Sequence, residues 1–267
     1  MAINPSVQSD VATANVVIRQ YPFSIALDAW ALLVTSFLLL LGMRCLPLLF
    51  LQVVIIVIPV ALLVRNDYVN FLLLGPGGTP PTFQGYARLS LYKLFLVRDV
   101  YAAPSPDRTR NPSNGILKQL PYRSGPRPKV AGLAPQRQLN QPASPECYAA
   151  LRKAIESLAK SDSDSLSTGT SCVEKHGFGF FARHPVTAWG NGEICHIHDI
   201  DKSMHMNLHA DDIKEVLEKG WGERHPLGFT GPIKAPCPST FIMVYAPRGK
   251  AVATRGSRGS FANAKMV

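Results

Sequence analysis

Histidine is the residue type whose placement in this chain most clearly suggests chemistry. All seven histidines fall within positions 176–225 of a sequence of 267 residues. They are His176, His184, His196, His198, His205, His209 and His225. Imidazole exchanges protons near neutral pH and also ligates transition metals. The clustering therefore indicates a site for proton transfer or metal binding in the C-terminal part of the chain.

Three of these histidines are spaced so that a β-hairpin would bring them together. Residues 193–198 and 203–208 have the composition of two strands, and the polar residues 199–202 between them predict a turn. In this register His196 faces His205, with about 5 Å between cross-strand neighbours. Because side chains alternate along a strand, one face of the hairpin gathers the polar residues. These are His196, His198, His205 and Asn207.

The opposite face of the same hairpin is apolar, which predicts a core beneath the histidines. It comprises Cys195, Ile197, Met204, Met206 and Leu208. Helices that can cover this core are expected over residues 145–160 and 212–219, where apolar residues recur at helical spacing. The first is expected to be capped by Ser144 and the second by Asp211 or Asp212.

Two further segments complete the predicted domain. The polar run 161–171 predicts a loop, and residues 240–245 predict a buried strand. Strand, strand, helix and strand make a compact α+β unit. We therefore predict a small antiparallel sheet with packed helices within residues 146–248.

The N-terminal part of the chain has the composition of a membrane anchor. Residues 23–64 hold two apolar stretches, Ile25–Met43 and Cys45–Val64, each near the ~20 residues that cross a bilayer as a helix. One or two spans are therefore predicted after an N-terminal tail, 1–22. The region 65–145 carries eleven Lys or Arg residues against three acidic ones, which favours a cytosolic C-terminal domain. An internal membrane, the endoplasmic reticulum, is the expected location.

The region 65–145 itself is expected to be a juxtamembrane segment and linker. A weakly apolar run over 89–97 predicts an amphipathic helix. Residues 104–145 are rich in Pro, Arg, Ser and Asn, which predicts an extended, mostly irregular chain. The basic Gly/Ser/Ala tail 249–267 is expected to be disordered.

The net charge of +10 does not indicate a nucleic-acid partner. Most of the excess follows the apolar stretches and lacks interleaved aromatic residues, so attraction to anionic lipid headgroups explains it better. The five cysteines are scattered without CxxC spacing, as expected for reduced thiols in the cytosol. The expected partners are membrane lipid and a small apolar metabolite.

The motifs around the hairpin resemble the fungal luciferase family. They are Glu193-Ile194-x-His196-x-His198-Asp199, His205, Gly220-Trp221-Gly222-x-Arg224-His225-Pro226-Leu227 and Tyr245-Ala246-Pro247-Arg248. Further matches are Arg65-x-Asp67-Tyr68, Gly75-Pro76 and Gln136-Arg137-Gln138. The resemblance covers roughly Pro59 to Arg248, with the GWGxRHPL block as its most specific part.

The resemblance implies an O2-dependent oxygenase without an organic cofactor. Luminous members of the family oxygenate a hydroxylated styryl-pyrone, and relatives also occur in fungi that do not glow. A basic imidazole, His196 or His198, would remove a proton from the enol of the substrate, and the enolate would react with O2. Asp199 or Glu193 would orient that base, and Arg224 would hold the anionic oxygen. The further candidate catalytic residues are His205 and His225, and the candidate substrate-binding residues are Glu193, Asn207 and Trp221.

Two alternatives remain open at the level of sequence. His196, His198 and His205 would supply three imidazoles for zinc or non-haem iron, although the metal-free reading is favoured. Alternatively, the histidines form a solvated sheet face of a membrane-tethered domain that is non-catalytic or binds a ligand.

Overall fold

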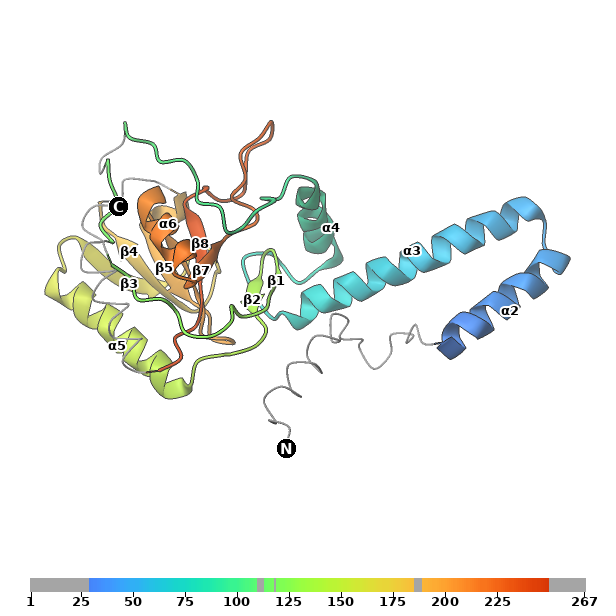
Figure 1. Ribbon diagram of the computed structural model, residues 1–267, viewed down its shortest axis with the longest axis horizontal. Coiled ribbons are helices and arrows are strands. Elements are labelled where there is room, and N and C mark those ends of the chain that lie inside the picture. Colours follow the sequence, from blue (N-terminus) through green and yellow to red (C-terminus); the bar gives the residue numbers. More distant parts are fainter. Residues whose placement is uncertain (1–28, 110–112, 118, 185–188, 250–267) are drawn as a thin grey trace, which may run out of the picture. The chain divides into compact units, whose positions relative to one another are not determined.

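The computed structural model describes residues 29–109, 113–117, 119–184 and 189–249 (Figure 1). The chain forms two compact units, Met1–Leu73 and Leu74–Val267. The predicted N-terminal tail, 1–22, and all but the first residue of the basic tail 249–267 lie outside the described residues.

The first unit contains two apolar helices, α2 (Ala29–Cys45) and α3 (Leu48–Leu73). The break between them falls at Pro47, whose carbonyl accepts the Leu51 N–H at 3.1 Å and so starts the next helix. Helix α3 has 26 residues, runs beyond its predicted end at Val64, and is long and apolar enough to cross a bilayer. Of the one or two predicted spans, it alone reaches that length among the described residues.

The second unit begins with a short helix and a small hairpin. Helix α4 (Phe83–Leu91) starts earlier than the predicted run over 89–97, because the Thr82 side chain caps it by accepting the Gly85 N–H at 3.1 Å. A 3-10 turn, η1 (Tyr92–Leu94), follows it. Strands β1 (Val130–Gly132) and β2 (Gln136–Gln138) then pair antiparallel in a sheet of their own.

The irregular stretch before this hairpin makes hydrogen bonds to residues within 212–222. The N–H groups of Ile116 and Leu117 each donate to Asp212 at 2.7 Å. Arg127 donates to the Leu217 carbonyl at 2.5 Å and to that of Gly222 at 2.8 Å. Residues of the predicted linker 104–145 therefore contact the region of the helix predicted over 212–219.

The main sheet has six antiparallel strands in the order β3-β4-β5-β6-β8-β7 (Figure 1). The strands are β3 (Leu166–Thr170), β4 (Phe178–Ala182), β5 (Glu193–Ile197), β6 (Met204–Asn207), β7 (Gly222–Arg224) and β8 (Phe241–Val244). A short 3-10 segment, η2 (Trp189–Gly192), leads into β5. Together with the helices, this sheet confirms the predicted α+β class.

Two helices pack against the sheet and form one core with it. As predicted, helix α5 (Pro145–Ser161) is capped by Ser144, whose hydroxyl accepts the Cys147 N–H at 3.3 Å. Helix α6 (Ala210–Glu218) follows β6. The core joins α5 and α6 to the apolar face predicted for the hairpin. Its members include Leu151, Ile155, Cys195, Ile197, Met204, Met206, Leu208, Ile213, Val216 and Leu217.

Two local predictions are wrong. Residues 166–170 of the predicted loop 161–171 form strand β3, whose exposed polar residues at the sheet edge hide the alternation that marks a strand. The cap of α6 is His209 rather than Asp211 or Asp212, because the His209 Nδ1 accepts the Asp211 N–H at 3.2 Å.

Candidate functional site

The predicted hairpin has the expected register. His196 on β5 pairs with His205 on β6, and the His198 N–H donates to the Ser203 carbonyl at 2.8 Å. The three imidazoles therefore lie on one face, opposite the core. They are only 2% (His196), 1% (His198) and 4% (His205) exposed, so this face is not a solvated one.

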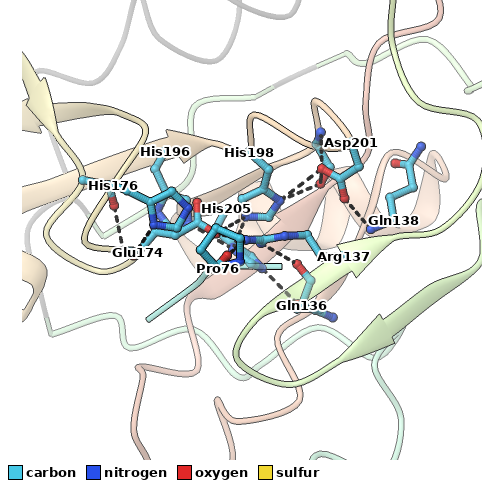
Figure 2. Close-up of polar contacts among 12 residues, drawn as sticks. Pro76, Gln136, Arg137, Gln138, Glu174, His176, His196, His198, Asp201 and His205 are labelled. Carbon is cyan, nitrogen blue, oxygen red and sulfur yellow. Dashed lines mark hydrogen bonds and ion pairs between the residues drawn. The ribbon is translucent and has the colours of Figure 1, made fainter. Parts of the chain in front are cut away.

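Each of the three rings has one nitrogen that points away from the other two rings, here called the outer nitrogen. In His196 and His198 this nitrogen faces oxygen acceptors. The Nδ1 of His196 lies 2.5 Å from Oε1 of Glu193, which also accepts the Ser171 hydroxyl at 2.9 Å. The Nδ1 of His198 lies 3.3 Å from Oδ1 of Asp201 (Figure 2). It also lies 2.9 Å from the Ser203 hydroxyl. Each ring is thus oriented by a carboxylate or by a hydroxyl beside one.

The outer nitrogen of His205 faces the small β1-β2 hairpin. Its Nε2 lies 3.0 Å from Oε1 of Gln136 (Figure 2). The amide nitrogen of Gln136 donates to Oε1 of Glu223 at 3.1 Å. The Tyr245 hydroxyl donates to the other Glu223 oxygen at 2.9 Å. Burial raises the pKa of both Glu223 and Tyr245.

The second nitrogen of each ring, here called the inner nitrogen, faces the other two rings. The Nδ1 of His205 lies 3.2 Å from Nε2 of His196 and 3.1 Å from Nε2 of His198. One nitrogen of each ring lies within 4.8 Å of the other two, a spacing that can hold a metal ion. Burial lowers the pKa of His198 and, with repulsion from neighbouring histidines, lowers that of His205 well below its ordinary value. Both rings are therefore neutral at neutral pH.

A buried ion pair borders the cluster. Arg137 on β2 is hydrogen-bonded to Glu174, and both side chains are 4% exposed. Oε1 of Glu174 lies 3.9 Å from Nε2 of His198, so this acid is beside the inner nitrogens (Figure 2). The Arg137 guanidinium also donates to the Pro76 carbonyl at 2.6 Å, which ties the pair to the start of the second unit.

A cavity of about 230 Å³ opens onto one side of the cluster. Its walls include His196, His205, Trp189, Leu227, Phe241, Arg137 and Glu174. The Trp189 and Phe241 rings meet edge to face with centroids 4.7 Å apart. Apolar walls with a few convergent polar groups are typical of a site for a small organic ligand.

His225 lines the same cavity, but its ring already has hydrogen-bond partners. Its Nδ1 accepts the Leu227 N–H at 3.1 Å, and the ring also bonds to the backbone of Leu133. Burial and the neighbouring histidines lower the pKa of His225 to about 3. The Cys237 sulfur lies 3.6 Å from the same Nδ1, and burial raises the pKa of that thiol to about 12. At neutral pH the imidazole is therefore unprotonated and only weakly basic, and the thiol keeps its proton.

Comparison with known proteins agrees with these motifs. The profile of the luciferase domain matches residues 191–251. The luciferase of Neonothopanus nambi is 32% identical over 207 residues, which cover 70% of this chain and 75% of that protein. The luciferases of Armillaria gallica and Armillaria mellea are each 33% identical with the same coverage. The chain belongs to the fungal luciferase family. No solved structure matches it.

Not every candidate site residue of this luciferase-family domain lies at the cluster. Asp199 is exposed and accepts the Tyr148 hydroxyl at 2.7 Å. Asn207 accepts the Thr240 hydroxyl at 2.6 Å, and Trp221 donates to the Pro121 carbonyl at 2.5 Å. Arg224 donates to the Gly228 carbonyl at 3.1 Å and lines a different cleft, with Asp99 and Phe229. The cluster itself brings together His196, His198, His205 and Glu193, with His225 beside them.

Four residues at the site were not among the sequence candidates: Gln136, Glu174, Asp201 and Glu223. Gln136 lies in a motif shared with the luciferase family, so the resemblance carried a signal for it, whereas Glu223 occupies the unmatched x position of the GWGxRHPL block. Asp201 lies in the predicted turn, where an acid is also a normal turn former. Glu174 had no signal, because only the fold brings it to the histidines.

Proposed function

We propose that this luciferase-family protein catalyses an O2-dependent oxidation of a small, apolar, enolisable metabolite of the pyrone type or a related class. The observation that carries the proposal is that two histidines of the buried cluster, His196 and His205, form part of the wall of the cavity. The relatives named luciferases support oxidation chemistry. O2 is the proposed co-substrate, and no organic cofactor is required.

The substrate must be activated before O2 can react with it. An enol is a poor electron donor until it loses its proton, so a group on the cavity wall has to favour the enolate. Of the two cluster residues on that wall, His196 is the better proton acceptor, because Glu193 holds its Nδ1–H and stabilises the imidazolium that would form. His205 lacks a carboxylate partner and its pKa is strongly lowered by burial.

The remaining walls suit a flat, apolar molecule. Trp189, Leu227 and Phe241 offer apolar surface. Arg137 supplies a cation on the wall, the role predicted for Arg224. A cation close to the enolate oxygen would stabilise its developing charge. Exclusion of water from a cavity this small would strengthen both effects.

The test is O2 uptake, with light detection in parallel, by the detergent-solubilised protein supplied with a 3-hydroxylated styryl-pyrone. We expect uptake that His196→Ala reduces by about 100-fold or more, the usual range for loss of a general base. His184→Ala is the matched control, since His184 is exposed. A folded protein that consumes no O2 with this compound or its enolisable analogues would contradict the proposal.

The proposal includes a membrane anchor. Helix α3 is proposed to hold the domain at the cytosolic face of an internal membrane, such as the endoplasmic reticulum, by a single pass. The basic excess over 65–145 supports this orientation through the positive-inside rule. An apolar substrate that partitions into lipid would then be concentrated near the cavity. Anionic lipid, rather than nucleic acid, is the proposed partner of the basic residues.

A further inference from the structure

We propose that His196, His198 and His205 bind one divalent transition-metal ion through their inner nitrogens. This inference rests on the proposed function for its substrate and O2, and it changes only the group that activates the enol, from a free imidazole to a bound ion. The sequence favoured a metal-free site, whereas the hydrogen-bond partners of the three rings favour a bound metal ion.

The first argument is the position of the proton on His196. Glu193 accepts the N–H groups of Cys172 at 2.6 Å and Val173 at 3.2 Å and the Ser171 hydroxyl, so its carboxylate acts purely as an acceptor. The Nδ1 of His196 must therefore carry the proton that faces Glu193. In the neutral ring this leaves a lone pair on Nε2, the inner nitrogen.

The same reasoning applies to His198. Asp201 accepts the Gln138 N–H at 2.5 Å, the Ser203 N–H at 3.1 Å and the Ser203 hydroxyl at 2.9 Å. Because that hydroxyl has given its proton to Asp201, its oxygen can only accept from Nδ1 of His198. The Nε2 of His198 is again left with a lone pair.

The third ring is fixed by a longer chain of bonds. Glu223 accepts from the Tyr245 hydroxyl and from the amide nitrogen of Gln136, so the Gln136 oxygen must face His205. That oxygen can only accept, which places the His205 proton on Nε2 and the lone pair on Nδ1. All three outer nitrogens are thus donors, as in histidines that ligate metals.

Three lone pairs consequently converge on one buried point. They repel one another at 3.1 Å and 3.2 Å unless a cation lies between them. With metal–nitrogen bonds of about 2.1 Å, two nitrogens on one ion lie roughly 3.0 to 3.4 Å apart at bond angles near 90–109°. The inner nitrogen of His205 already has this separation from each of its two neighbours, and all three nitrogens lie within 4.8 Å of one another.

The buried charge around the cluster also favours a divalent cation. Glu174 is paired with Arg137. Glu193 and Asp201 have no lysine or arginine partner in the part of the chain that the structure describes. Buried carboxylates without a compensating cation are costly, and two of them balance the charge of one divalent ion.

The ligands and their setting indicate the class of metal. Neutral imidazoles suit zinc, iron, cobalt, nickel and copper, and they suit magnesium or calcium poorly. Three protein ligands leave at least one coordination position open, the arrangement of catalytic rather than structural sites. Because His196 and His205 line the cavity, that position would be reached from the cavity.

Occupancy would change the chemistry of the site. A bound ion would supply a positive charge that favours the enolate oxygen, and the enol proton would pass to the Glu174 carboxylate on the same cavity wall. The inner nitrogens then no longer act as bases. Metal content therefore separates the two ways of activating the enol.

The test uses the full-length protein, purified in detergent without chelator and without a polyhistidine tag. We expect about one zinc or iron ion per chain by elemental analysis, as for a preformed site. After stripping with a chelator, titration with Co²⁺ should give the visible bands of cobalt bound to nitrogen, and Zn²⁺ should raise the unfolding temperature. These measurements do not depend on turnover.

Variants then locate the ion. His196→Ala and His205→Ala should abolish the cobalt bands, whereas His184→Ala, at an exposed position, should leave them unchanged. Should the buried variants fold poorly, Gln136→Leu provides a second check, with cobalt affinity about 10- to 100-fold weaker, the usual effect of losing an outer partner of a ligating histidine.

The outcomes distinguish this inference from the proposed function. A folded wild-type protein that binds none of Zn²⁺, Co²⁺ and anaerobic Fe²⁺ would overturn the metal site, and chelator-resistant O2 uptake would then leave the proposed function standing. Cobalt bands that persist in His196→Ala would also overturn it. Metal binding at the three histidines without O2 uptake would support the site and reject the proposed function.

Discussion

Nε2 of His205 lies 3.0 Å from Oε1 of Gln136, a residue 69 positions earlier in the chain. This bond links the histidine cluster on the main sheet to strand β2 of a separate small sheet. The same amide reaches Glu223. The small hairpin therefore decides which nitrogen of His205 carries the proton, and this hairpin lies outside the luciferase-domain match.

Gln136→Leu tests this dependence. The variant removes the acceptor of His205 and the donor to Glu223, so His205 is free to move its proton to the inner nitrogen. We expect O2 uptake and cobalt affinity to fall about 10- to 100-fold. Stability should fall by about 1–3 kcal/mol, because two buried polar groups lose a partner. Leu139→Ala, at a 54% exposed position just after the same strand, is the control for both measurements.

Glu193→Gln tests the orientation of His196. A glutamine oxygen can still accept the Cys172 and Val173 N–H groups, which places its amide nitrogen against His196. The His196 proton must then move to the inner nitrogen, and one lone pair of the cluster is lost. We expect at least a 100-fold loss of O2 uptake. Ring ¹⁵N NMR should show the changed tautomer. Glu156→Gln, at a partly exposed acid on α5, should change neither the tautomer nor O2 uptake.

The hairpin could be predicted from sequence because its signals are local. Alternation over 193–208 fixed the strands, the turn and the face on which His196 and His205 meet, and the register is as predicted. The helix after Ser144 was equally readable, because its cap and its apolar stripe agree.

The surroundings of the hairpin could not be predicted, because they depend on contacts between distant segments. Gln136 lies in a stretch whose composition predicts an irregular linker, and nothing near Glu174 marks it as a neighbour of His198. Burial of the histidine face follows from these long-range contacts. Asp199 and Asp201 both lie in the predicted turn, and only the structure shows that Asp201 is buried while Asp199 is exposed.

A pair of variants two positions apart tests that distinction. Asp201→Asn should destabilise the protein by about 1–3 kcal/mol, because a buried acceptor of several hydrogen bonds is replaced by a group that also donates. It should also lower O2 uptake, since the position of the His198 proton is no longer fixed. Asp199→Asn should change stability by less than about 1 kcal/mol, as its partner Tyr148 is bonded at the surface. Equal effects in denaturant unfolding and O2 uptake would refute the assignment.

Charges placed in α3 test the membrane anchor. Ile56 and Ile58 lie within the apolar helix, and arginine at the centre of a span costs about 2.5–3.5 kcal/mol per residue for insertion. The double variant Ile56→Arg, Ile58→Arg should therefore shift the protein from the membrane fraction to the carbonate-soluble fraction. The matched variant Ile56→Leu, Ile58→Leu should stay with the membrane. An unchanged distribution of the arginine variant would argue against a span at α3.

The buried Glu223 predicts a particular dependence of stability on pH. Burial raises its pKa in the folded protein, whereas the unfolded chain has a value of about 4.3. The folded state therefore keeps the proton longer, so this residue favours folding below the unfolded pKa, and that contribution is lost as pH rises through the folded pKa. Glu223→Gln removes the titration. Its unfolding temperature should lie below that of the wild type at pH 4, because the bonds to Gln136 and Tyr245 are disturbed, and the gap should narrow towards pH 7. Parallel curves for the two proteins between pH 4 and 7 would show that Glu223 does not titrate with a raised pKa.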